Sequence, residues 1–146
     1  MLPNTPQPLG AYVEAVQSGN LLFLSGTLPI KDGKPQYVGR LGKELDADAG
    51  RDALRTATLN ALSVAKEHLG SLDRVSKVVR VGVYLATSGD FYNQPIVADA
   101  ASELLRDVFG EDKMSVRSVI GVAALPLGAP VMLEVTFEVE NKEGAS

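Results

Sequence analysis

Residues 75–86 decide the fold of this chain, and they read Val75-Ser76-Lys77-Val78-Val79-Arg80-Val81-Gly82-Val83-Tyr84-Leu85-Ala86. The run predicts a β-strand, because it is rich in β-branched residues and carries little charge. Alternation places Val75, Val79, Val81, Val83 and Leu85 on one face, and Val78, Arg80, Gly82, Tyr84 and Ala86 on the other. Both faces of this strand are largely apolar, so both need to be covered.

A long amphipathic helix is predicted before this strand. Apolar residues recur with a 3.6-residue period up to Leu69, at Ala49, Ala53, Leu54, Ala57, Ala61, Leu62 and Ala65. We expect Asp46 or Asp48 to cap the start of the helix and Gly70 to end it.

A second helix is predicted after the strand, from about Phe91 to Phe109, with Pro95 in its first turn. The side chains that we expect it to turn inward are Ile96, Val97, Ala100, Ala101, Leu104, Leu105 and Val108.

The remaining strands are predicted at 11–16, 21–24, 36–39, 115–123 and 131–140, with a tight hairpin tip at Asp32-Gly33. The order of elements indicates an α+β domain, with two helices on one face of a mostly antiparallel sheet. We expect one domain over residues 1–146, with an irregular lead-in at 1–9 and a flexible tail at 141–146.

The second face of the sheet predicts self-association. Two helices can cover only one face, yet residues 21–24, Leu-Leu-Phe-Leu, are apolar on both. Another copy of the same sheet is the simplest cover for the remaining face, so we expect a homo-oligomer.

Composition narrows the class of protein. The chain has 146 residues, no cysteine and a formal charge of −4. The lack of cysteine excludes disulfides and thiolate metal sites, and fits a cytoplasmic protein. No signal peptide or membrane helix is predicted, no motif indicates a metal or a cofactor, and the acidic charge argues against nucleic acid as a partner.

Two charged residues in strands are candidates for chemistry. Arg117 lies in a strand that is otherwise uncharged, so its side chain either reaches solvent at the sheet edge or binds an anion such as a carboxylate. Glu134 alternates with Leu133 and Val135, so it either belongs to a solvated face or serves as a general base on a covered one.

Four segments, taken together, resemble the RidA/YjgF family, also called L-PSP endoribonucleases. In chain order they are Leu9-Gly10-Ala11-Tyr12-Val13, Leu24-Ser25-Gly26-Thr27-Leu28-Pro29, Val116-Arg117-Ser118-Val119 and Leu133-Glu134-Val135. The spacing from Arg117 through Leu125-Pro126 to Glu134 is the most specific part of the resemblance.

The resemblance implies a chorismate-mutase-like (bacillus type) domain that assembles as a trimeric barrel, with clefts between subunits. It also implies hydrolysis of reactive enamines and imines, such as 2-aminoacrylate, to 2-keto acids and ammonia. In this pattern Arg117 binds the substrate carboxylate and Glu134 positions or activates water. The substrate pocket would include Tyr12, Ser25, Thr27, Ser118 and Val119.

This sequence departs from the family pattern at three positions of that region. Val119 stands where the family often has Cys, Thr27 where Gln commonly follows Ser-Gly, and Gly121 where an acidic residue is frequent. The departures indicate a divergent subgroup and leave its substrate open.

Four functions are compatible with these observations. The first is imine deamination by Arg117 and Glu134, and the second is a non-catalytic trimer that binds 2-keto acids and dispenses with Glu134. Ribonuclease activity is implied by the family name alone and fits poorly with the acidic charge. Chorismate mutase activity would follow from fold analogy alone, and a single arginine is weak evidence for a site that binds a dicarboxylate substrate.

Overall fold

The computed structural model describes residues 2–5, 7–8 and 10–140. Within these residues the elements are β1 (Ala15–Ser18), β2 (Leu21–Leu24), β3 (Ile30–Lys31), β4 (Lys34–Pro35), α1 (Ala47–Leu69), η1 (Leu72–Arg74), β5 (Val75–Ala86), α2 (Gln94–Phe109), η2 (Glu111–Lys113), β6 (Val116–Val122), η3 (Pro126–Gly128) and β7 (Val131–Val139). The predicted α+β class is confirmed. The tail predicted at 141–146 lies outside the described residues.

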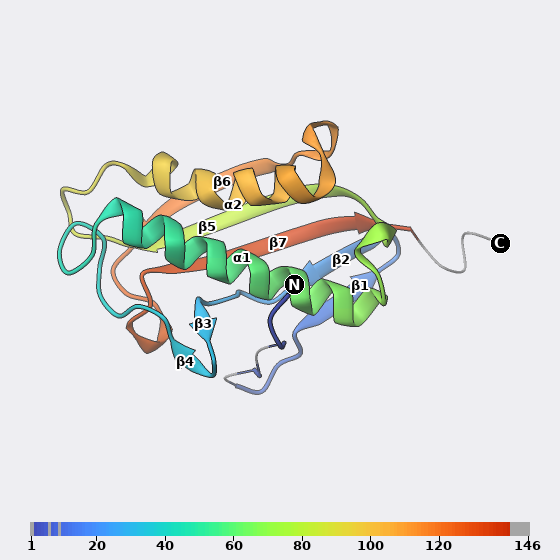
Figure 1. The fold of residues 1–146 in the computed structure, drawn as a ribbon, viewed down its shortest axis with the longest axis horizontal. Helices are drawn as coiled ribbons and strands as arrows, with labels where there is room; N and C mark the ends of the chain where they lie inside the picture. Colours follow the sequence, from blue (N-terminus) through green and yellow to red (C-terminus); the bar gives the residue numbers. More distant parts are fainter. Residues whose placement is uncertain (1, 6, 9, 141–146) are drawn as a thin grey trace.

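The strands of the large sheet lie in the order β1-β2-β7-β5-β6. Neighbouring strands are antiparallel except β5 and β6, which run parallel. A parallel pair needs a crossover connection, and α2 provides it. Both α1 and α2 lie on the same face of the sheet, as predicted (Figure 1). We call the other face the open face.

Helix α1 begins and ends where its capping residues predict. Asp46 is the N-cap, and its Oδ1 accepts a hydrogen bond of 2.9 Å from the backbone N–H of Ala49. Gly70 ends the helix in the left-handed conformation at φ 84°, and its N–H donates to the carbonyl of Lys66. The predicted bounds of this helix are therefore confirmed.

Helix α2 begins at Gln94, later than the predicted start at Phe91. The N–H of Phe91 instead closes a turn by donating to the carbonyl of Ser88. Pro95 lies in the first turn, as predicted, where its missing N–H leaves no helix hydrogen bond unmade.

Two side chains predicted to point inward from α2 remain exposed. Ile96 is 51% exposed and Val108 is 44% exposed. Ile96 lies about 100° around the helix axis from the buried Val97, on the flank of the apolar stripe. In the last turn it is Phe109 that meets the core, with its ring centroid 5.8 Å from that of Phe137 in an edge-to-face contact.

Strand β5 is not regular along its length. Its pairing with β7 shifts register at two points, one of them between Val78 and Arg80. Such a β-bulge changes which face the side chains on either side of it occupy. Val78 is consequently buried in the core at 1% exposure, whereas Val79 is half-buried. The prediction that Val79 shares a face with Val81 and Val83, with Val78 on the opposite face, is therefore wrong.

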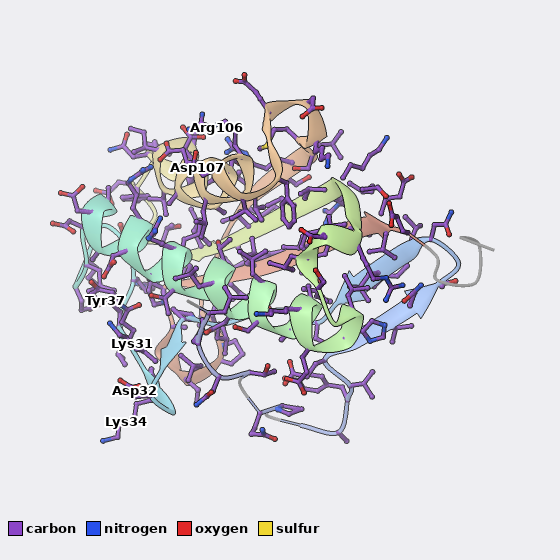
Figure 2. All side chains as sticks on the ribbon, turned by 45° about the vertical axis from the view of Figure 1, so that its right-hand side comes forward. Lys31, Asp32, Lys34, Tyr37, Arg106 and Asp107 are labelled. Atoms are coloured by element: carbon purple, nitrogen blue, oxygen red, sulfur yellow. The ribbon has the colours of Figure 1, made fainter. Side chains whose placement is uncertain are left out.

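The predicted hairpin tip is confirmed, but the strand predicted at 36–39 is not. Asp32 and Gly33 form a two-residue turn with φ of 54° and 77°, so β4 pairs with β3 directly after it. The chain then leaves the hairpin, and the Tyr37 hydroxyl donates a 2.7 Å hydrogen bond to Asp52 of α1. Figure 2 shows Tyr37 beside this short hairpin, at the lower left of the molecule.

The open face carries apolar side chains exposed to solvent. The strand register places Val16, Phe23, Thr136, Arg80 and Val116 in one row across the sheet. Of these, Val16, Phe23 and Val116 are 52%, 43% and 70% exposed. The prediction of a second apolar face is confirmed, while the trimer that would cover it stays a prediction.

Candidate functional site

The sheet separates the two residues predicted to carry the chemistry. Arg117 and Val135 both pair with Val81, which is fully buried beneath the helices. Glu134 lies next to Val135 on β7 and therefore projects from the open face. Within one chain, the guanidinium and the carboxylate lie on opposite sides of the sheet.

Arg117 is held by helix α2. Its Nη1 donates a 2.8 Å hydrogen bond to Oδ1 of Asp99 and a 3.2 Å hydrogen bond to Oγ of Ser102. These two residues are three positions apart, so they share one side of the helix. Among the described residues none bonds Nε or Nη2 of Arg117, and 26% of its side chain is exposed. One edge of the guanidinium is thus left for a second anion.

Glu134 belongs to a polar cluster at the centre of the open face. Its Oε1 accepts a 2.6 Å hydrogen bond from the Tyr84 hydroxyl and lies 3.9 Å from Nη1 of Arg80. The hydrogen bond to the Glu134 carboxylate, with a smaller contribution from burial, raises the pKa of Tyr84 above its ordinary value. Within the described part of the chain no group bonds Oε2, and the carboxylate is 42% exposed.

A glycine makes room for this cluster. Gly82 stands opposite Glu134 in the register, and a Cβ on it would lie 3.0 Å from Nη1 of Arg80 and 3.3 Å from Oε1 of Glu134. A side chain at this position would displace the two charged groups. Ser118, a predicted pocket residue, pairs with Gly82 from the other side and also projects from the open face.

The segment that follows β2 runs beside Glu134. The backbones of Thr27 and Leu133 exchange hydrogen bonds of 2.8 and 2.9 Å, next to Glu134 in the sequence. Thr27 is 8% exposed, and its hydroxyl donates to the carbonyl of Ser25. The hydroxyl of Ser25 in turn donates a 2.6 Å hydrogen bond to the carbonyl of Val13.

Ser25 therefore fastens the segment that carries Tyr12, whose side chain is 46% exposed. Val119, the last predicted pocket residue, lies two positions beyond Arg117 on β6 and packs half-buried against the core beneath the helices. Most of the predicted site residues thus divide into two groups. Arg117, Val119 and the buried Thr27, which bridges Leu133, lie on the helix side, and Glu134 and Ser118 lie on the open face. Tyr12 and Ser25 lie in the segments that flank the β1–β2 hairpin.

Four residues of these two groups were missed by reasoning from the sequence, namely Arg80, Tyr84, Asp99 and Ser102. The cross-strand partners of Glu134 follow once the β5–β7 register is known, and that register depends on the bulges in β5. The α2 partners depend on how the helix lies over β6.

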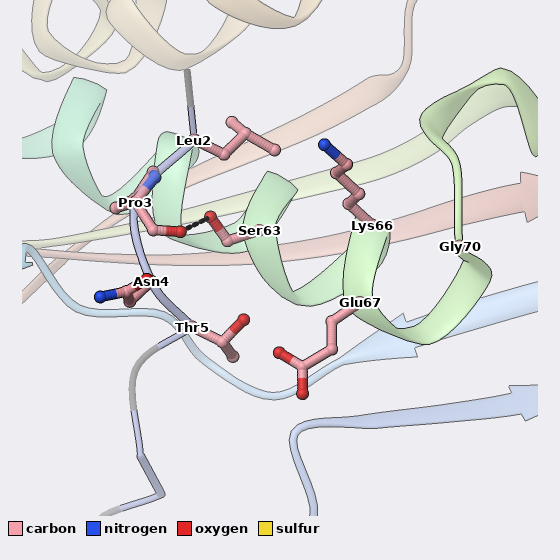
Figure 3. A pocket seen from close by; sticks show the side chains of 8 residues that line it. All are labelled: Leu2, Pro3, Asn4, Thr5, Ser63, Lys66, Glu67 and Gly70. Atoms are coloured by element: carbon pink, nitrogen blue, oxygen red, sulfur yellow. Dashed lines mark hydrogen bonds between the residues drawn. The ribbon is translucent and has the colours of Figure 1, made fainter.

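A surface hollow of about 390 Å³ lies between the N-terminal segment and α1 (Figure 3), lined by Leu2, Pro3, Asn4, Thr5, Ser63, Lys66, Glu67 and Gly70. The Ser63 hydroxyl donates a 2.7 Å hydrogen bond to the carbonyl of Pro3, which ties the segment to the helix. No predicted site residue lines this hollow. Among the described residues, no cluster of three or more His, Asp or Glu side chains is arranged to hold a metal ion.

The fold and the strand order define a class of protein, the chorismate-mutase-like α+β domains. The chain belongs to the YjgF/RidA family within it, because the family model described as "YjgF/chorismate mutase-like, putative endoribonuclease" matches residues 1–139.

Similar proteins are found over nearly the whole chain. Protein TCP17 of Trypanosoma cruzi is 39% identical over 141 residues, covering 96% of this chain and 88% of the relative. The 2-iminobutanoate/2-iminopropanoate deaminase of Dermatophagoides farinae is 30% identical, covering 94% of this chain and 93% of that protein. The crystal structure of Atu1372, a protein of unknown function from Agrobacterium tumefaciens, has a TM-score of 0.90 at 31% identity, covering 95% of this chain and 86% of that one.

Among the residues that the structure describes, no helix is both long enough and apolar enough to cross a membrane.

Proposed function

We propose that this protein hydrolyses 2-imino acids and their enamine tautomers to 2-keto acids and ammonia. The observation that carries the proposal is the Arg117 guanidinium, held in place by α2 with its Nε–Nη2 edge unbonded by any described residue. A relative that is 30% identical over nearly the full length is named as a deaminase of such imines.

Arg117 binds the substrate carboxylate in this proposal. The Nε–Nη2 edge of a guanidinium matches the two oxygens of a carboxylate, which fixes the orientation of the carbon next to it. That carbon bears the C=N bond, so the contact places the electrophile as well as the anion. The pocket is completed by Val119 and Ser118 on the same strand, and by Tyr12, Ser25 and Thr27 from the segments that flank the β1–β2 hairpin.

Glu134 activates the water. Its Oε1 is oriented by Tyr84, and Oε2 accepts a proton from the water as the water oxygen attacks the imine carbon. As the water oxygen bonds to carbon, the C=N double bond of the N-protonated imine becomes a single bond to an NH2 group. Glu134 then returns its proton to this nitrogen and the C–N bond breaks. The hydroxyl of the carbinolamine becomes the carbonyl of the 2-keto acid, and its proton leaves with the ammonia as ammonium. An enamine substrate is first protonated on carbon to give the same imine.

The placement of these residues requires two chains for one site. Arg117 and Glu134 lie on opposite sides of the sheet in one chain, so we propose that the Arg117 edge of one protomer meets the open face of its neighbour. A cyclic arrangement of three chains covers every open face and forms three such clefts. We place this homotrimer in the cytoplasm, as expected from the sequence.

A second candidate function is binding of 2-keto acids without catalysis. It is favoured by the placement of Arg117 and Glu134 on opposite sides of the sheet, because the carboxylate-binding edge of Arg117 within one chain has no base beside it. In this case Glu134 would have no chemical role.

Imines generated in situ distinguish the two functions. An amino-acid oxidase acting on a panel of amino acids releases 2-imino acids, and their decay can be followed with and without the purified protein. Faster decay of at least one imine, with stoichiometric ammonia and 2-keto acid, supports the enzyme. Unchanged decay across the panel, together with measurable 2-keto acid binding, favours the binding function.

A further inference from the structure

Asp99, the ion-pair partner of Arg117, carries a negative charge that binding of a substrate carboxylate does not require. We call the Nε–Nη2 edge of Arg117, which is proposed to bind that carboxylate, the carboxylate seat. Asp99 lies in the middle of α2, away from both helix ends, so it caps neither. Its Oδ1 accepts the 2.8 Å hydrogen bond from Arg117, and 50% of its side chain is exposed. Among the described residues, none bonds Oδ2 of Asp99. This ion pair therefore offers an open guanidinium edge on Arg117 and an open carboxylate oxygen on Asp99.

The two groups together have no net charge. A ligand that carries only a carboxylate is attracted by Arg117 and repelled by Asp99, which stands within hydrogen-bond distance of the same guanidinium. A ligand that carries a carboxylate and an adjacent N–H cation can satisfy both groups at once. The hydroxyl oxygen of Ser102 accepts a second hydrogen bond from the same Nη1 of Arg117, which helps to hold the ion pair in place.

We propose that Asp99 determines the specificity of this site by selecting dipolar ligands, in which a cationic nitrogen sits next to a carboxylate, over simple 2-keto acid anions. The inference rests on the proposed role of Arg117 as the carboxylate seat. Arg117 takes the carboxylate through Nε and Nη2, and Oδ2 of Asp99 accepts a hydrogen bond from the protonated imine nitrogen. The substrate thus binds in its N-protonated form, which is also the more electrophilic one.

Hydrolysis then weakens the complex. The C–N bond is broken, the nitrogen leaves as ammonia, and the remaining 2-keto acid has no cation to offer to Asp99. The same aspartate that favours the substrate therefore disfavours the product. Product release is promoted by a change of charge in the ligand, with no movement of the protein required.

Two stable probes test this without relying on catalysis, namely 2-aminobutanoate, which is dipolar, and 2-oxobutanoate, which is a simple anion. Their affinities for the full-length protein are measured by calorimetry at low salt for the wild type, Asp99→Asn and Asp107→Asn. Asp107 is the matched control, because it also lies on α2 and is exposed, but about 12 Å further along the helix (Figure 2).

The wild type should bind 2-aminobutanoate more tightly than 2-oxobutanoate. In Asp99→Asn the ratio of the two affinities should shift toward the keto acid by roughly tenfold or more, the scale of one charged hydrogen bond. Asp107→Asn should leave the ratio within about twofold of the wild type, as expected for an exposed charge far from the ligand.

An unchanged ratio in Asp99→Asn, with both probes still bound, overturns the role of Asp99 and leaves the carboxylate seat intact. Equal binding of both probes in Arg117→Lys and the wild type overturns the seat itself. If neither probe binds the wild type, both ideas fail together.

Discussion

The hydroxyl of Tyr84 donates a 2.6 Å hydrogen bond to Oε1 of Glu134, across two neighbouring strands of the sheet. This bond fixes one oxygen of the proposed base and leaves the other for water. Tyr84→Phe should therefore reduce kcat for imine hydrolysis by about tenfold through loss of orientation, with little change in KM. A rise in KM with constant kcat would show that Tyr84 contacts substrate instead.

The same bond predicts a pH dependence of stability. The hydrogen bond to the Glu134 carboxylate, more than burial, raises the pKa of Tyr84 above the ordinary value of a tyrosine. A raised phenol pKa means that the interaction contributes its full stability below the ordinary tyrosine pKa and loses it as pH rises through the folded-state pKa. The free energy of unfolding of the wild type should therefore fall more steeply above pH 10 than that of Tyr84→Phe. If the free energies of unfolding of the wild type and of Tyr84→Phe change in parallel from pH 8 to 11, the prediction is wrong.

Glu134→Gln tests the general base. The amide keeps the size of the carboxylate but cannot take a proton, so imine hydrolysis should slow by about 10²–10⁴-fold while affinity for 2-oxobutanoate is retained. Glu138→Gln is the matched control, because Glu138 lies four residues further along β7 and on the same face. Equal hydrolysis rates in the wild type and Glu134→Gln would place water activation elsewhere.

Arg117→Lys tests the carboxylate seat. An ammonium can still pair with Asp99, but it lacks the two parallel N–H donors of the guanidinium edge. Affinity for 2-oxobutanoate should fall by roughly 1.5–3 kcal/mol, the scale of a charge-assisted hydrogen bond, as measured by calorimetry. Retained affinity would assign Arg117 to holding α2 against β6 alone.

The predicted homotrimer depends on the open face. Phe23→Asp puts a charge on a side chain that is 43% exposed in the single chain and would be covered in the assembly. Light scattering should report a trimer for the wild type and smaller species for this variant. Val38→Asp serves as the control, because Val38 is 64% exposed in the loop after β4. A wild-type monomer at micromolar concentration would contradict the trimer and the shared cleft.

Local signals predicted the helices and the hairpin well, because their causes are local. Asp46, Gly70 and the Asp32-Gly33 turn act within a few residues of chain, and the structure uses each of them as expected. The exchange of Val78 and Val79 was not predictable in this way, since a bulge depends on the partner strand.

The site was predicted less completely for the same reason. Arg117 and Glu134 stand out as charges in apolar strands, but their partners come from elements distant in sequence. Asp99 meets Arg117 only because α2 crosses over β6, and Tyr84 meets Glu134 only through the pairing of β5 with β7. The periodicity of the sequence predicts neither the crossing of α2 over β6 nor the register between β5 and β7.

Strand β6 lies at the border of the sheet, with β5 on one side and, among the described residues, no strand on the other. It also bears Val116 and Ile120, which are 70% and 45% exposed. Free backbone donors and acceptors beside apolar side chains are a template for uncontrolled strand addition. If the proposed homotrimer covers this edge, dilution or a mutation that separates the subunits should lead to turbidity and loss of recoverable protein, and the shelf life of the protein in solution would follow its assembly equilibrium.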